Sequence, residues 1–240
     1  MSIVFAGTPE NAAISLRELV SAGVPVSLVL TRPDSPVGRK GIITPSPVAL
    51  AASELGLPII KSNTVDEPVI HEIKRSGAKL AIVIAYGVIL KASALSALSL
   101  GWFNVHYSLL PRWRGAAPVQ QAIMAGDREA GVSVFKIDEG LDTGDVVASL
   151  PTIIERTENA DSLLRRLTHL GVTLLLEVLP RIESGTAVFQ KQVEVGITIA
   201  RKPTRANCKL DFTQDAKTLE AIVRGANPEP GAWTDTSLGL

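Results

Sequence analysis

The chain has 240 residues, of which 46% are hydrophobic and 20% charged, with 24 basic residues against 24 acidic ones. This hydrophobic share can fill a sizeable core, and the balanced charge excludes a generally basic nucleic-acid-binding surface, so any RNA contact must be a local patch. A single cysteine, Cys208, excludes an internal disulfide framework and a cysteine-based zinc site, as expected in a reducing cytosol.

The first thirty residues predict a strand, a helix and a second strand. Residues 2–6 form an apolar run, helical spacing follows a Gly-Thr-Pro turn as far as Ala22, and residues 26–30 are again apolar. Such a unit implies a parallel sheet with right-handed crossovers. The N-terminus lacks the basic region of a signal peptide, and the longest apolar run, residues 80–85, is too short to span a membrane. We therefore expect a cytoplasmic protein without membrane contact.

Residues 31–47 carry four prolines, two glycines and three basic groups, which predict a long functional or mobile loop. The run at 80–85 is apolar on both faces, as in a central parallel strand. The remaining periodicities predict helices at 48–55, 66–76, 116–125, 159–179 and 217–224, and strands at 57–60, 102–106, 132–137 and 146–154, the last two paired.

The predicted fold is α/β, with a Rossmann-like, open and mostly parallel sheet and helices on both of its faces. The catalytic domain should cover residues 1–186. After Gly185 the periodicity fades, so residues 187–207 should form a linker with one or two short strands. Residues 208–240 should form a partial C-terminal domain.

Asn104 and His106 lie two apart at the end of a predicted strand, so both side chains point to one face. Ligands of open α/β sheets bind beyond the carboxyl ends of the strands. A carboxamide and an imidazole there can donate hydrogen bonds to a developing oxyanion, and the imidazole can also move protons near neutral pH. Two alternatives stay open: a structural histidine and a turn-forming asparagine.

The segment 137–145, IDEGLDTGD, predicts an acidic loop between two strands. A carboxylate from this loop could orient the imidazole of His106. The alternative is a metal-free surface turn, and the ligand spacing of an EF-hand is absent. The turn after the first strand lacks GxGxxG, and no GxxxxGK[ST] motif occurs, so the sequence does not predict dinucleotide binding or a phosphate-binding loop.

The run NVHYSLLPRWRGAAPVQQAI, followed by GLDTGD, resembles the folate-dependent formyltransferase family. The resemblance implies that Asn104, His106 and Asp142 are catalytic and that 10-formyltetrahydrofolate donates the formyl group without a metal. It also implies a folate site built from the SLLP loop, the strand-end segment AYGVIL and the acidic loop, with these residues: Ser108, Leu109, Leu110, Pro111, Val88, Ile89, Leu90 and Asp138. Position 107 is Tyr, where many members carry a smaller residue, and its side chain should point away from the catalytic pair.

Four further stretches, FAGTPE, TRPDSPVGRKGIITPSPV, WRGAAPVQ and NPEPGAWT, resemble the branch of the family that formylates methionyl-initiator tRNA. Members of this branch usually continue into a full C-terminal β-barrel, of which residues 208–240 resemble only the start, so we expect a truncated barrel domain. A monomer is expected. The basic residues expected to meet tRNA phosphates are Arg32, Arg39, Lys40, Arg112 and Arg114.

Other functions remain open at this point. The basic loop can be an ordinary solvated loop. A formyltransferase acting on an amino sugar, or a formyl-folate hydrolase, would share the SLLP and acidic-loop features and would not need that basic loop. A third alternative is an inactive folate- or RNA-binding remnant.

Overall fold

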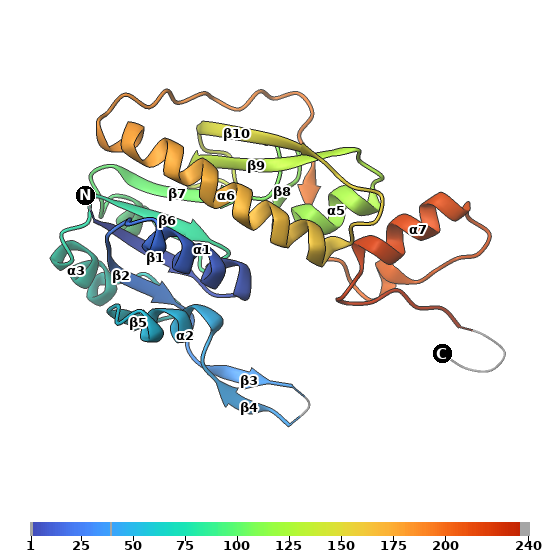
Figure 1. The fold of residues 1–240 in the computed structure, drawn as a ribbon, viewed down its shortest axis with the longest axis horizontal. Helices are drawn as coiled ribbons and strands as arrows, with labels where there is room; N and C mark the ends of the chain where they lie inside the picture. The colour runs from blue at the N-terminus through green and yellow to red at the C-terminus, as the bar shows by residue number, and fades with distance from the viewer. Residues whose placement is uncertain (1, 39, 236–240) are drawn as a thin grey trace.

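A seven-stranded sheet forms the centre of the computed structural model, which describes residues 2–38 and 40–235 (Figure 1). The strand order is β10-β9-β7-β6-β1-β2-β5, in which β5, β2, β1, β6 and β7 run parallel while β9 is antiparallel to both of its neighbours. The predicted mostly parallel sheet is confirmed. The strands are β1 (Ile3–Gly7), β2 (Val26–Thr31), β5 (Ile59–Lys61), β6 (Leu80–Ile84), β7 (Gly101–His106), β9 (Glu129–Lys136) and β10 (Val146–Ile153).

Helices cover both faces of the sheet, as predicted (Figure 1). One core contains side chains of α1 (Glu10–Ser21), α2 (Pro47–Glu54), α5 (Pro118–Met124) and α6 (Ala160–Glu183). The opposite core contains side chains of α3 (Glu67–Arg75) and α4 (Ala92–Leu95), a short helix that the periodicity did not predict.

Local sequence features explain where these helices begin. Asn159 and Ser162 form a capping box at the start of α6, where a side-chain oxygen takes up an otherwise unpaired backbone N–H. Ser46 caps α2 in the same way, and its hydroxyl lies 2.6 Å from that of Thr31, which ties α2 to the end of β2. Gly7 lets α1 approach β1 closely, because an added Cβ would lie 2.7 Å from that of Ala12.

The strand order reverses between β1 and β6. From β1 the chain first builds outward through β2 and β5, and then crosses back to add β6 and β7 on the other side. Adjacent loops therefore leave in opposite directions at the carboxyl ends of these strands, which is where α/β sheets bind ligands. Asn104 and His106 lie at this edge, at the carboxyl end of β7.

The prediction that residues 31–47 form one long loop is wrong in part. The segment contains an antiparallel hairpin of β3 (Ser35–Val37) and β4 (Ile42–Thr44), which projects from the body of the molecule (Figure 1). Proline and glycine obscured these strands. In a two-stranded hairpin each strand is an edge, so a proline such as Pro36 is tolerated there.

After α6 the chain returns alongside the edge strand β10 rather than leading away from the sheet (Figure 1). The backbone of Gln190 pairs with that of Val146 in β10, and β11 (Ile199–Ala200) runs parallel to β8 (Arg114–Gly115). The linker therefore holds one short strand, within the one or two predicted, and its partner is a strand that the sequence did not predict.

The C-terminal segment contains a short 3-10 helix (Ala206–Cys208) and α7 (Ala216–Gly225), which lies beside α5 (Figure 1). Contact between the two helices is close, since a Cβ on Gly225 would lie 2.5 Å from the Cγ of Met124. Within residues 2–38 and 40–235, no helix is both long enough and apolar enough to cross a membrane.

Candidate active site

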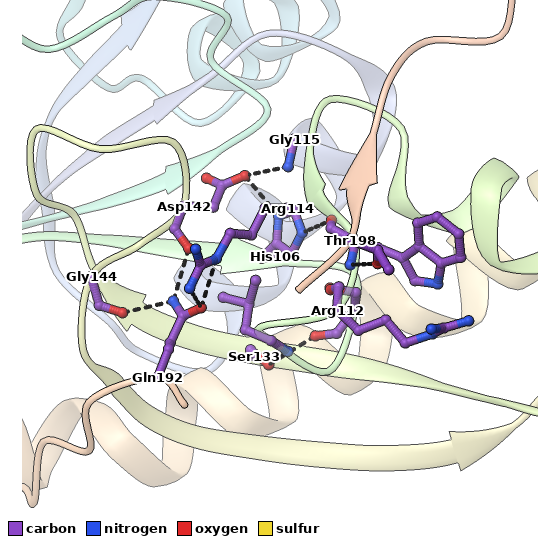
Figure 2. A network of polar contacts seen from close by, with 12 residues as sticks. His106, Arg112, Arg114, Gly115, Ser133, Asp142, Gly144, Gln192 and Thr198 are labelled. Atoms are coloured by element: carbon purple, nitrogen blue, oxygen red, sulfur yellow. Dashed lines mark hydrogen bonds and ion pairs between the residues drawn. The ribbon is translucent and has the colours of Figure 1, made fainter. Parts of the chain in front are cut away.

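The imidazole of His106 and the carboxylate of Asp142 meet at the carboxyl edge of the sheet, as the sequence predicts (Figure 2). His106 Nδ1 lies 3.7 Å from Asp142 Oδ2, and the side chains are 5% and 17% exposed. The two residues come from the end of β7 and from the loop between β9 and β10. This distance allows strong electrostatic coupling but is too long for a direct hydrogen bond.

The hydrogen bond of the other ring nitrogen, Nε2, determines the tautomer of His106. Nε2 lies 2.8 Å from the carbonyl oxygen of Trp113. Because a carbonyl only accepts, Nε2 carries the proton, and the lone pair of the neutral ring is on Nδ1, toward Asp142. Burial lowers the pKa of His106, an effect only partly opposed by the Asp142 carboxylate and the Trp113 carbonyl. The ring is therefore neutral at physiological pH and basic at Nδ1.

Asp142 is held in an unusual backbone conformation, with φ of 51°. Its Oδ2 accepts a hydrogen bond of 2.7 Å from the backbone N–H of Gly115. The predicted folate residue Asp138 is exposed, and its carboxylate accepts bonds from the Gly140 N–H and the Thr143 hydroxyl, so it shapes the acidic loop from within.

Backbone strain gathers at this edge. Within the described chain the non-glycine residues with positive φ are Ala85, Trp113 and Asp142, which follow β6, β7 and β9. Left-handed backbone costs of order 1–3 kcal/mol per residue and concentrates at functional sites. The three loops are thus built for placement of their groups rather than for stability.

Asn104 is half-buried and lies on the same face as Trp102, while Phe103 and Val105 point into the opposite core. Within the described part of the chain its carboxamide makes no hydrogen bond, so its donors remain available to a ligand. Tyr107 points away from Asn104 and His106, as predicted, and packs in the other core with its hydroxyl 3.1 Å from the carboxamide nitrogen of Asn11.

Two side chains of the SLLP loop make contacts within the protein that hold the loop in place. The buried Ser108 hydroxyl donates to the carbonyl of Arg112 at 2.6 Å, and the side chain of Leu109 lies against Gly131 of β9. Leu110 and Pro111 are half-buried. Of the four predicted folate contacts here, Ser108 and Leu109 are therefore committed to holding the loop.

The structure does not bring Val88, Ile89 and Leu90 onto one wall. Ile89 is 91% exposed, whereas Leu90 is buried in the second core and Val88 packs against that core. The segment follows β6, and its backbone is left-handed at Ala85 and Gly87. These turns change the direction of the chain, so the side chains that follow point in different directions. Resemblance alone could not reveal that division.

The five predicted tRNA contacts have different environments. Arg32 is exposed and bonded to Asn63, and Lys40 is exposed in the hairpin, whereas Arg39 lies outside the described residues. Arg112 forms a bidentate pair with Asp127 at 3.0 and 2.6 Å. Arg114 is turned inward, where its guanidinium donates twice to Gln192.

Sequence reasoning missed the contribution of the linker to this site. Thr198 accepts a bond from the backbone N–H of Trp113 through its hydroxyl and one from that of Arg114 through its carbonyl. Gln192 bonds to the acidic loop (Figure 2). These residues lie in a polar stretch without periodicity, so no local signal marked them. Among the described residues, no cluster of three or more His, Cys, Asp or Glu side chains could bind a metal ion.

The sheet has a topological switch point, and a strand-end histidine faces a carboxylate at its carboxyl edge. The family model described as formyl transferase matches residues 1–179, and the chain belongs to that family. A solved sugar N-formyltransferase from Shewanella sp shares the fold, with a TM-score of 0.75 and 16% identity over 100% of this chain and 94% of that one. A 4-N formyltransferase from Francisella tularensis does so with a TM-score of 0.73 and 14% identity, over 100% and 94% of the two chains.

Similarity in sequence identifies a particular branch. A methionyl-tRNA formyltransferase from Renibacterium salmoninarum is 44% identical over 98% of this chain and 76% of its own length. Another from Symbiobacterium thermophilum is 45% identical over 100% of this chain and 74% of its own length. The predicted family is confirmed.

Proposed function

We propose that this enzyme transfers a formyl group from 10-formyltetrahydrofolate to the α-amine of methionyl-initiator tRNA, in support of translation initiation. The observation that carries the proposal is the approach of His106 to Asp142, beside the uncommitted carboxamide of Asn104. The relatives named methionyl-tRNA formyltransferase support the acceptor. Two structural neighbours support the donor, a sugar 3N-formyl transferase with 5-N-formyl-THF and HypX from Aquifex aeolicus with tetrahydrofolic acid.

The chemistry follows from the groups present. The neutral amine attacks the formyl carbon, which forms a new C–N bond and places negative charge on the formyl oxygen. Asn104 donates to that oxygen, and a donor of this kind is worth roughly 10²–10³ in rate. Nδ1 of His106, directly or through a water, accepts the proton of the attacking amine and returns it to N10 of the folate as the C–N10 bond breaks. Asp142 stabilises the intermediate imidazolium.

The remaining expectations form part of the same proposal. Residues 1–186 are the catalytic domain, 187–207 the linker, and 208–240 the start of a C-terminal barrel domain, supported by the pairing of Lys209 with Trp233. Arg32, Arg39 and Lys40 meet tRNA phosphates, and Leu110 and Pro111 line the folate site. The protein acts as a cytoplasmic monomer.

An acceptor assay tests the proposal directly. The purified protein should formylate charged initiator tRNA from 10-formyltetrahydrofolate, and His106→Asn should lower the rate at least about 100-fold. His71→Asn is the matched control, because His71 is exposed on α3. Transfer to a nucleotide-linked amino sugar with none to tRNA would favour the sugar formyltransferases, which the structural neighbours suggest.

The hairpin supplies an independent test of the acceptor. Replacing residues 35–44 by a short glycine-serine turn should raise the KM for charged tRNA and leave folate binding nearly unchanged, since the hairpin projects from the body (Figure 1). Equal losses for both substrates would argue against phosphate recognition by this hairpin.

A further inference from the structure

The side chain of Gln192 makes four hydrogen bonds, two to the acidic loop and two with Arg114 of β8. Its Nε2 donates to the carbonyl oxygens of Asp142 at 2.8 Å and Gly144 at 2.9 Å. Its Oε1 accepts from Nε and Nη2 of Arg114 at 2.9 and 2.7 Å. Both donors and the acceptor oxygen of the carboxamide are therefore in use, and their orientation is fixed from both sides.

We propose that Gln192 is a positioning residue for Asp142, which makes the linker part of the catalytic site. The inference rests on the proposed function, because it assigns Gln192 a role through the carboxylate that faces His106. Gln192 itself need not touch either substrate.

The loop that carries Asp142 is exposed and strained. Residues 138–141 of this loop are exposed, and Asp142 has a left-handed backbone that costs free energy to maintain. The Gly115 N–H holds one carboxylate oxygen of Asp142. Without a partner for the Asp142 carbonyl, the backbone could relax about this single contact and carry the carboxylate away from the imidazole.

Gln192 completes a closed path around the carboxylate (Figure 2). The path runs from the Asp142 carbonyl to Gln192, from Gln192 to the Arg114 guanidinium, along the chain to Gly115, and from the Gly115 N–H back to the Asp142 carboxylate. Backbone and side chain of Asp142 are thereby fixed to one reference, the β8 segment. This explains why Arg114 is turned inward.

The linker backbone is anchored on both sides of Gln192 by contacts that do not involve the Gln192 side chain. Gln190 pairs with Val146, and the carbonyl of Thr198 accepts from the Arg114 N–H. Replacement of Gln192 should therefore leave the linker in place and release only the acidic loop. Gln190 provides the matched control, since it is exposed and, among the described residues, its hydrogen bonds are made by its backbone.

The experiment is a double-mutant cycle in the full chain, with formyl transfer from 10-formyltetrahydrofolate to charged initiator tRNA as readout. Gln192→Leu should lower kcat by about 10- to 100-fold, because misplacing a catalytic group by about 1 Å costs up to that much, and should change KM for both substrates little. Gln192→Glu, which keeps acceptors for Arg114 but loses both donors to the loop, should show the same loss. Gln190→Leu should retain the parent kcat.

The cycle separates positioning from a general structural effect. If Gln192 acts through Asp142, adding Gln192→Leu to Asp142→Asn should lower kcat by less than about threefold. A further loss as large as in the parent would overturn the proposal, and so would full activity of both Gln192 variants. If Asp142→Asn lowers kcat while both Gln192 variants retain the parent kcat, only the positioning role of Gln192 is overturned. If Asp142→Asn retains the parent kcat, the proposed catalytic set is overturned, and with it the positioning role of Gln192.

Discussion

Replacing Asp142 by Asn removes one negative charge 3.7 Å from Nδ1 of His106 and keeps the shape of the side chain. At about 4 Å, two unit charges attract by about 1 kcal/mol in water and about 4 kcal/mol at an effective dielectric constant of 20. Both side chains are mostly buried, which favours the upper part of this range. Each 1.36 kcal/mol corresponds to about tenfold in rate, so the lost stabilisation of the imidazolium should lower kcat/KM by roughly 5- to 1,000-fold.

The pH dependence provides a second readout of the same change. Burial already lowers the pKa of His106, and the Asp142 carboxylate opposes this effect. Without the carboxylate the pKa should lie lower still. Because the neutral ring is the base, the acidic limb of the kcat/KM profile should move to lower pH in Asp142→Asn.

Steady-state formyl transfer measured across the neutral range, with saturating folate, gives both quantities. Asp145→Asn is the control, since this residue lies in the same loop and contacts Lys136 through its backbone carbonyl. A loss below about fivefold, the low-coupling limit, or an acidic limb that moves to higher pH, would refute the coupling of the two side chains.

Three further substitutions test the acidic loop, the ion pair of Glu158 with Arg166 and the contact between α5 and α7. Gly144→Ala places a Cβ 1.7 Å from the carbonyl oxygen of Lys136, so the acidic loop must move, and kcat should fall at least about 100-fold. Desolvation raises the pKa of Glu158, but the hydrogen bonds from Arg166 and from the Glu155 N–H, together with the charges of Arg166 and Arg224, outweigh it and leave the pKa lowered. A carboxyl group whose pKa is lowered in the folded state stabilises the fold at neutral pH, and this stabilisation is lost as the pH falls through that pKa. Glu158→Gln should therefore lower the free energy of unfolding in urea by about 1–3 kcal/mol at neutral pH, and by less in acid. Gly225→Leu should force α7 off α5 and lower the free energy of unfolding by about 1–3 kcal/mol.

Each of these predictions has its own control and contrary result. Parent activity in Gly144→Ala would show that the loop geometry is not required. For the buried carboxylate, Glu155→Gln is the exposed neighbour for comparison, and a deficit in Glu158→Gln that grows as pH falls would reverse the expected sign. Adding Met124→Ala to Gly225→Leu should restore part of the lost stability, because Met124 is the nearest side chain. If the stability does not recover, the side chain introduced by Gly225→Leu must clash with a group other than Met124.

Local pattern in the sequence was sufficient for the strands of the main sheet, for most of the helices and for the placement of two of the three proposed catalytic residues on one strand. Apolar runs and helical spacing depend only on neighbours in the chain, so β1, α1 and α6 could be predicted from them. Alternation along a strand placed Asn104 and His106 on one face for the same reason. The proposed role of Asp142 comes from resemblance, and the structure confirms that its carboxylate approaches His106.

Tertiary structure alone decided how the site is held. The carbonyl of Trp113 selects the proton-bearing nitrogen of His106, and Gln192 reaches Asp142 across 50 positions of sequence. Such contacts join one polar group to one backbone atom, so they require neither a repeat nor a particular neighbour and leave no periodic trace. They exist only because α6 ends where it does and the chain then returns alongside β10 to reach β8 (Figure 1).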